Sequence, residues 1–122
     1  MDWKEFQEHA RLKMGAHFNV ALKEHKPSGS PKKFDFVSQT EDIVGDAKYL
    51  TLVRRESLPP AKFMEIAGHV WLLEKLPGAK RRFLVFGNQR RVPEWWLEKY
   101  GTLLTTVEFY FLGENGTLDQ LR

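Results

Sequence analysis

The sequence of residues 34–53 is FDFVSQTEDIVGDAKYLTLV. It holds two apolar runs, 34–38 and 43–53, and the polar residues between them are typical of a turn, so we expect a β-hairpin. Side chains alternate between the two faces of a strand. Both faces of the second run are largely apolar, which is typical of a buried central strand, yet this run also carries Asp46 and Lys48.

Asp46 and Lys48 should share one face of the second strand, because side chains two residues apart point the same way. The strand rise then places their Cα atoms roughly 6–7 Å apart. The hairpin would also bring Asp35, which lies between apolar residues of the first run, beside Asp46. A buried charge costs several kcal/mol unless it is paired or coordinated, so these three side chains are the candidates for chemistry.

Two adjacent carboxylates repel each other, and one of them keeps its proton unless a cation lies between them. A divalent ion such as Mg²⁺ or Mn²⁺ prefers oxygen ligands and would resolve this conflict at Asp35 and Asp46. Lys48 would then orient or deprotonate an attacking water, an arrangement suited to phosphodiester hydrolysis. The alternative is a structural salt bridge between Asp46 and Lys48, or exposure of both to solvent, with Asp35 only starting a turn.

The other elements follow from hydrophobic spacing and from proline and glycine. Apolar residues three and four apart predict a helix over 2–16, ended by Gly15, and a second helix over 61–76. A short helix is expected to begin at Pro93. Further strands are expected over 17–24, 81–87 and 102–112, with a turn-rich tail after them.

The resulting order is helix, three strands, helix, strand, short helix and strand. That order is typical of an α/β protein with a mixed sheet and flanking helices. The chain of 122 residues is long enough for one packed domain, so we expect 1–122 to be a single domain.

This arrangement resembles the PD-(D/E)xK nucleases, the restriction-endonuclease-like superfamily that also contains archaeal Holliday-junction resolvases. The resemblance rests on Asp35, on the sequence Asp46-Ala47-Lys48 and on the αβββαβ order of residues 2–90. In that family the two acidic residues bind the metal and the lysine assists the water. The resemblance therefore implies a restriction-endonuclease-like core, followed by a short helix and a final strand, in a Mg- or Mn-dependent endonuclease that acts on DNA.

Further residues are implied by the same resemblance. The carbonyl of Ala47 would add a metal ligand. Many members use a glutamate of the first helix, for which Glu5 and Glu8 are the candidates here. The sequence departs from the family pattern at Phe34, where proline is usual, and at Asp46, where glutamate is more common.

Positive charge is concentrated in the middle of the chain. Residues 54–91 carry nine Lys or Arg and three Glu, for a net charge of +6, whereas the remainder sums to −3. A basic stretch of this kind suits nucleic acid, although it would also serve solubility alone. The residues expected to bind nucleic acid are Arg54, Arg55, Lys80, Arg81, Arg82, Arg90, Arg91 and Trp95. Of the pair Trp95 and Trp96, one should belong to the core instead.

Several classes of protein are excluded by what the sequence lacks. Cysteine is absent, which excludes disulfides and thiolate metal sites. The sequence has no phosphate-binding loop, so nothing supports a nucleotide cofactor. It also has no G-x-S-x-G motif, which excludes serine hydrolases of that type. No stretch approaches the roughly 20 apolar residues of a membrane span, and the N-terminus is too charged for a signal peptide, so we expect a cytoplasmic protein. His69 lies on the polar side of its helix and is expected at the surface.

Two other functions remain open. One is a non-catalytic nucleic-acid-binding module on the same fold, which would use Asp46 and Lys48 structurally. The other is a protein-interaction domain that pairs with a partner through an exposed edge of the final strand, 102–112. A homodimer of the nuclease would supply two cuts to a duplex.

Overall fold

The structure is a computed structural model that describes residues 1–51, 60–104 and 106–122. Within these residues the helices are α1 (Trp3–Phe18), α2 (Pro60–Glu74) and α3 (Arg91–Tyr100), followed by the 3₁₀ turn η1 (Gly101–Leu103). The strands are β1 (Lys23–His25), β2 (Phe34–Val37), β3 (Ile43–Leu50), β4 (Arg81–Asn88), β5 (Val107–Leu112) and β6 (Leu118–Gln120).

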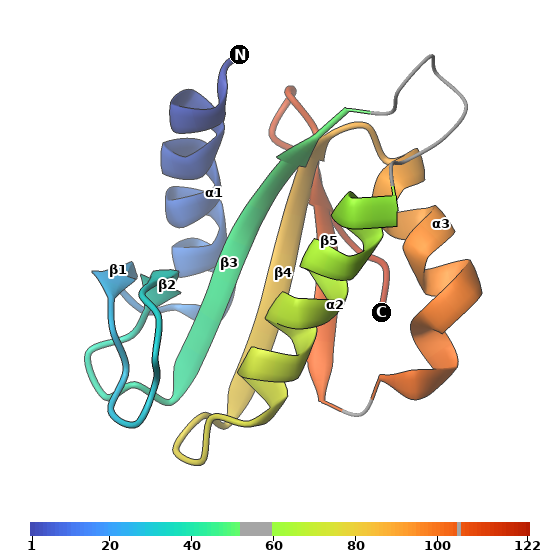
Figure 1. Ribbon diagram of the computed structural model, residues 1–122. Helices are drawn as coiled ribbons and strands as arrows, with labels where there is room; N and C mark the ends of the chain where they lie inside the picture. The colour runs from blue at the N-terminus through green and yellow to red at the C-terminus, as the bar shows by residue number, and fades with distance from the viewer. Residues whose placement is uncertain (52–59, 105) are drawn as a thin grey trace.

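The strands form one mixed sheet in the order β1-β2-β3-β4-β5-β6 (Figure 1). β2 is antiparallel to β1 and β3, the strands β3, β4 and β5 are parallel, and β6 returns antiparallel to β5. Parallel neighbours need a crossover, and α2 and α3 supply the two crossovers on one face of the sheet. The helix α1 covers the other face. The expectation of a mixed α/β fold is therefore confirmed.

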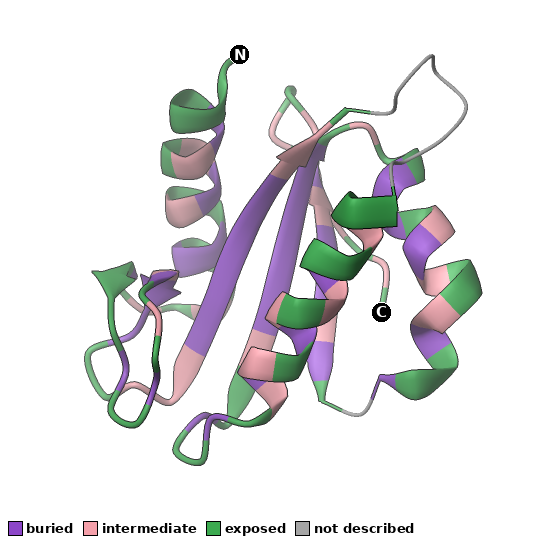
Figure 2. Cartoon of the chain, viewed as in Figure 1, coloured by how far each residue is buried: buried purple, intermediate pink, exposed green. Residues whose placement is uncertain are grey.

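Two apolar clusters fill the space on either side of the sheet. On one side Phe6, Ala10 and Met14 of α1 pack on the strands, and on the other side α2 and α3 contribute Ile66 and Trp96. Because both faces are covered, the central strands β3 and β4 are buried along most of their length, as Figure 2 shows. The buried central strand expected from the run 43–53 is present.

The first helix is longer than expected. It passes through Gly15, which was expected to end it, and stops at Phe18, where Asn19 takes a left-handed conformation with φ 57°. Gly15 instead permits a close approach, since a Cβ there would lie 2.9 Å from the carbonyl oxygen of Val20. The first two residues of the strand expected over 17–24 therefore belong to α1 instead, and the strand β1 comprises only Lys23–His25.

The C-terminal part differs from the expectation in a second way. The residues Gly101–Leu103 form a 3₁₀ turn, so the strand expected over 102–112 begins only at Val107. The tail contributes Leu118–Gln120 as β6, which pairs with β5 on the side away from β4. In the alternative of a protein-interaction domain, a partner would pair with the edge of the final strand. Along these residues that edge is covered by the chain itself.

The remaining boundaries agree within a few residues. The strand expected over 43–53 ends at Leu50, and its last two residues lie outside the described part of the chain. The expected helices and the strand over 81–87 shift by one or two residues at either end. Among the residues that the structure describes, no helix combines the length and the apolar character needed to cross a membrane.

Candidate active site

The strands β2 and β3 separate where the two predicted carboxylates lie. Their last backbone pairs are Val37 with Val44 and Phe36 with Gly45, so the next pair in this register would be Asp35 with Asp46. At that point side chains replace the backbone ladder. The amide of Asp35 donates to Oδ1 of Asp46 at 2.8 Å, and the next amide along β3 donates to Oδ2 of Asp35 at 2.9 Å. The prediction that the hairpin brings the two carboxylates together is confirmed.

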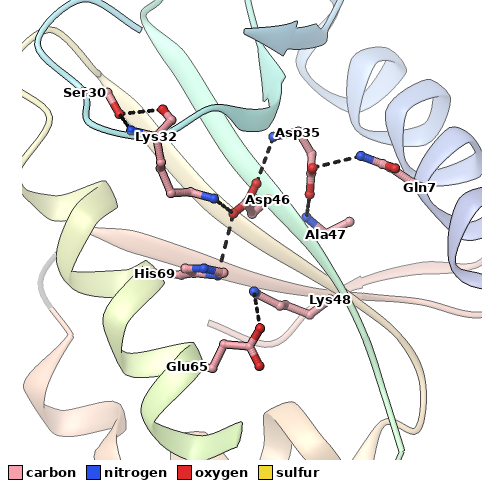
Figure 3. Close-up of polar contacts among 9 residues, drawn as sticks. All are labelled: Gln7, Ser30, Lys32, Asp35, Asp46, Ala47, Lys48, Glu65 and His69. Atoms are coloured by element: carbon pink, nitrogen blue, oxygen red, sulfur yellow. Dashed lines mark hydrogen bonds and ion pairs between the residues drawn. The ribbon is translucent and has the colours of Figure 1, made fainter. Parts of the chain in front are cut away.

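Asp46 is buried and has two nitrogen neighbours besides the amide of Asp35. Its side chain is only 3% exposed. Nζ of Lys32, from the loop before β2, lies 2.9 Å from Oδ2, and Nδ1 of His69 on α2 lies 3.7 Å from the same oxygen (Figure 3). The ammonium of Lys32 also lies 4.6 Å from the centre of the Phe34 ring. The buried carboxylate is thus neutralised by a lysine that the sequence did not indicate.

Lys48 lies two residues further along β3 and faces the same side. Its side chain is 7% exposed, and Nζ lies 3.7 Å from Oε1 of Glu65 on α2. Burial lowers the pKa of Lys48, although the charges of Asp46 and Glu65 act in the opposite direction. Lys48 pairs with α2, and Asp46 pairs with Lys32. The structure therefore does not show the direct Asp46–Lys48 salt bridge that was the structural alternative.

Asp35 is the more exposed of the two carboxylates. Oδ1 accepts a hydrogen bond from Nε2 of Gln7 on α1 at 2.8 Å. Burial, and then the charge of Asp46, raise the pKa of Asp35 to about 7, while the amide bond from Ala47 and the charge of Lys32 act in the opposite direction. One member of the pair therefore holds its proton until near neutral pH unless a further cation arrives.

These side chains line one open cleft of about 330 Å³. The cleft lies between the start of α1, the fork of β2 and β3, and the middle of α2. Its lining residues are Trp3, Lys32, Asp35, Asp46, Ala47, Lys48, Tyr49, Leu50, Glu65 and His69. The three residues assigned to chemistry from the sequence, Asp35, Asp46 and Lys48, therefore open onto a common space that can admit a substrate.

The first helix approaches the site through a residue that was not predicted. Glu5 is exposed, and its amide is bonded to Oδ1 of Asp2 at the helix start. Glu8 forms an exposed ion pair with Arg11 at 2.6 Å. Gln7 reaches Asp35 instead. The signal was present in the sequence, because position 7 lies four residues after Trp3 and three before Ala10, on the apolar stripe of the helix.

α2 contributes two residues that sequence reasoning missed. The prediction that His69 is a surface residue is wrong, since its side chain is only 22% exposed and faces Asp46. Burial and the charge of Lys48 lower its pKa to about 4, so the imidazole is neutral at physiological pH. Glu65 lies four residues earlier, on the same helical face. The sequence predicts that this polar face of α2 is exposed to solvent, but Glu65 and His69 on it face Lys48 and Asp46 of β3.

A magnesium ion can be tested against the oxygen atoms that this site offers. The described residues contain no group of three His, Cys, Asp or Glu side chains arranged to hold a metal. A site would rest on two carboxylates, one backbone carbonyl and water, which is a common way to bind Mg²⁺. The amide of Ala47 points toward Asp35, and the carbonyl of the same strand residue points to the same edge. This oxygen set fits Mg²⁺ or Mn²⁺.

The basic residues predicted to bind nucleic acid have different environments. Arg54 and Arg55 lie outside the described residues. Arg82 donates to the carbonyls of Leu73 and Leu76 at 2.7 Å each, so it satisfies one carbonyl in the last turn of α2 and one just beyond the helix. Arg82 therefore stabilises the fold in this region through its hydrogen bonds to the backbone.

Arg81 and Arg90 are also paired within the chain. Arg81 donates to both carboxylate oxygens of Glu108 at 3.1 and 3.0 Å, and Arg90 lies 2.6 Å from Asp119. Lys80 and Arg91 are exposed. Among the described residues that line the cleft, the lysines are Lys32 and Lys48.

The two tryptophans of α3 divide as expected. Trp96 is 3% exposed and donates from its ring nitrogen to the carbonyl of Phe63, so it is the core member of the pair. Trp95 is half-buried, and the guanidinium of Arg91 lies 5.2 Å from its ring centre. The exposed part of this pair remains the candidate for stacking on a base.

Neither the family models nor the curated proteins match this chain.

Proposed function

We propose that this protein is a metal-dependent nuclease that hydrolyses phosphodiester bonds in DNA. The observation that carries the proposal is the fork between β2 and β3, beside the buried amine of Lys48. There Asp46 accepts the amide of Asp35, and Asp35 accepts the amide of Ala47. A buried carboxylate beside a half-buried one, together with a buried lysine, is a costly combination for structure alone. The PD-(D/E)xK resemblance assigns the same three residues to catalysis.

In this proposal Asp35, Asp46 and the carbonyl of Ala47 would hold a Mg²⁺ ion. When bound there, the ion supplies Lewis-acid polarisation of the scissile phosphate and of the attacking water. Lys48, on the same face of β3, orients that water and accepts its proton, which its lowered pKa favours. The water oxygen bonds to phosphorus, one P–O ester bond breaks, and the leaving oxygen takes up a proton from solvent water in the open cleft.

The neighbouring side chains hold this arrangement in place. Glu65 keeps the amine of Lys48 directed toward α2, and Gln7 fixes one oxygen of Asp35 from the opposite helix. The neutral ring of His69 closes the cleft on the α2 side of Asp46. The chain is small, and its cleft is open. We therefore propose weakly sequence-specific or structure-specific cutting rather than recognition of a long site, and a homodimer would allow two cuts.

The test is cleavage of linear, nicked and branched DNA, with RNA included, in Mg²⁺, in Mn²⁺ and in EDTA. The variants are Asp46→Asn and Lys48→Met, and the matched controls are Glu98→Gln and Lys75→Met, which change exposed residues outside the cleft. We expect metal-dependent cutting that both site variants abolish and both controls retain. Cutting in EDTA, or cutting that survives in the folded site variants, would contradict the proposal.

If the folded protein shifts DNA in a gel but cuts none of these substrates, the non-catalytic binding module becomes the better description. If it neither binds nor cuts nucleic acid at low salt, the protein-interaction domain takes its place. Circular dichroism of each variant separates loss of function from loss of fold.

A further inference from the structure

Lys32 holds the position next to Asp46 that a cation is expected to take. Its Nζ lies 2.9 Å from Oδ2 of Asp46, and its side chain is 29% exposed. The other basic groups near this carboxylate are differently engaged. Lys48 is directed to Glu65, and Nδ1 of His69 lies 3.7 Å from Oδ2 of Asp46, farther away than Nζ of Lys32. Lys32 is therefore the charge that balances the buried Asp46.

The loop that carries Lys32 is held in place. The hydroxyl of Ser30 donates to the carbonyl of Lys32 at 2.7 Å and accepts from its amide at 3.1 Å. Ser30 and Pro27 are buried, and the amide of Ser28 donates to Glu41 at 2.7 Å. The ring of Phe34 lies under the ammonium. This ammonium is thus placed by the fold, unlike that of a freely moving surface lysine.

We infer that Lys32 is an internal counter-ion that occupies Asp46 when no divalent ion is bound, and that a divalent cation must displace it. This inference rests on the proposed function, because it concerns the same carboxylates. An ammonium and a metal ion compete for Oδ2 of Asp46, and both cannot approach it closely because like charges repel. The lysine therefore lowers the affinity of the site for divalent ions, while it stabilises the buried carboxylate without them.

The two effects of removing Lys32 have opposite signs. Without a divalent ion, a variant lacking the ammonium leaves Asp46 without its ion-pair partner and unfolds more easily. With the competitor gone, the same variant binds a divalent ion more tightly. A merely structural lysine would produce the first effect without the second.

The chain provides a matched control in the next residue. Lys33 carries the same charge on the same loop, but its side chain is 70% exposed and lies 3.9 Å from Glu24 instead of the site carboxylates. The variants are Lys32→Met, Lys32→Gln and Lys33→Met. Glutamine keeps a hydrogen-bond donor near Asp46, which guards against a variant that fails to fold.

The experiment is titration of the full chain with Mn²⁺ by calorimetry, with thermal unfolding in EDTA alongside. We expect both Lys32 variants to bind Mn²⁺ about tenfold more tightly than the wild type, and Lys33→Met to change the affinity by less than about twofold. In EDTA, Lys32→Met should unfold at a lower temperature than Lys33→Met.

The outcomes separate the inference from the proposed function. If the wild type binds Mn²⁺ and the Lys32 variants bind it no more tightly than Lys33→Met, the inference is overturned and the metal site stands. If only the Lys32 variants bind Mn²⁺, the inference is supported in its strongest form. If no variant binds the ion, both the inference and the metal-dependent function fail.

Discussion

Asp35 and Asp46 are bound to each other's strands: Asp46 accepts the amide of Asp35, and Asp35 accepts the amide of Ala47. Two negative charges are thus held side by side by backbone hydrogen bonds that neither strand can give up without leaving a buried amide unsatisfied. Burial and the neighbouring charge then raise the pKa of Asp35 to about 7. The relationship makes the fork a site that gains stability by taking up a proton or a cation.

The first prediction concerns Asp35 and pH. Its pKa rises from an ordinary 3.8 to about 7 on folding, so the folded chain keeps a proton that the unfolded chain loses in this range. The contribution of Asp35 to the free energy of unfolding is therefore full below about pH 4 and is lost as the pH rises to 7. Asp35→Asn should be more stable relative to the wild type at pH 8 than at pH 5, by about 1–3 kcal/mol.

Urea denaturation in EDTA at the two pH values measures this difference. His69 requires its own variant, because its pKa falls from 6.5 to about 4 and its contribution runs in the opposite direction, being lost as the pH falls through this window. His69→Gln should therefore lose the most stability relative to the wild type above pH 6.5. A pH-independent difference for Asp35→Asn would contradict the assigned environment of that carboxyl.

The second prediction distinguishes Gln7 from Glu5 on the first helix. Gln7 holds Oδ1 of Asp35 at 2.8 Å, whereas Glu5 is exposed. Gln7→Ala should weaken Mn²⁺ binding or cleavage by about 10–100-fold, because a residue that orients a metal ligand has effects of this size. Glu5→Ala is the matched control and should leave both unchanged. The reverse ranking in the same titration would restore the glutamate that the family resemblance suggested.

The third prediction concerns Glu65, which lies 3.7 Å from the amine of Lys48. Its charge raises the pKa of that amine against the effect of burial, so Glu65→Gln should lower the pKa further. If Lys48 accepts the proton of the water, the acidic limb of the rate–pH profile should move to lower pH. Glu94→Gln, which removes an exposed partner of Arg90, should leave the limb in place. A limb that moves upward would exclude Lys48 as the proton acceptor.

The fourth prediction separates a structural arginine from an exposed one. Arg82 satisfies one carbonyl in the last turn of α2 and one just beyond it, so Arg82→Ala should lower the free energy of unfolding by about 1–3 kcal/mol. Arg91 is exposed beside Trp95, and Arg91→Ala should leave stability unchanged while weakening DNA binding and reducing its salt dependence. Urea denaturation and gel shifts at two salt concentrations measure both variants. Equal loss of stability in the two would contradict this division.

Local rules account for much of the fold. The alternation in β3, the apolar stripe of α1 and the proline and glycine around α2 depend on neighbours within a few residues, so these elements were predictable within a few positions. The errors arose where contacts distant in sequence decide. Gly15 lies inside α1, which continues to Phe18, and its missing side chain leaves room for the carbonyl of Val20. The strand β6 forms because it can pair with the free edge of β5.

The sequence by itself determined the mixed α/β class and the pairing of Asp35 with Asp46, since a two-residue period and a short turn set the register of a hairpin. It also placed Lys48 on the face of Asp46. Only the tertiary structure decided which partners these charges have. Lys32 and Glu65 reach the cleft from a loop and from α2, and Gln7 reaches Asp35 from α1 on the opposite face of the sheet. The packing of those layers, which no local pattern encodes, brings these partners to the site.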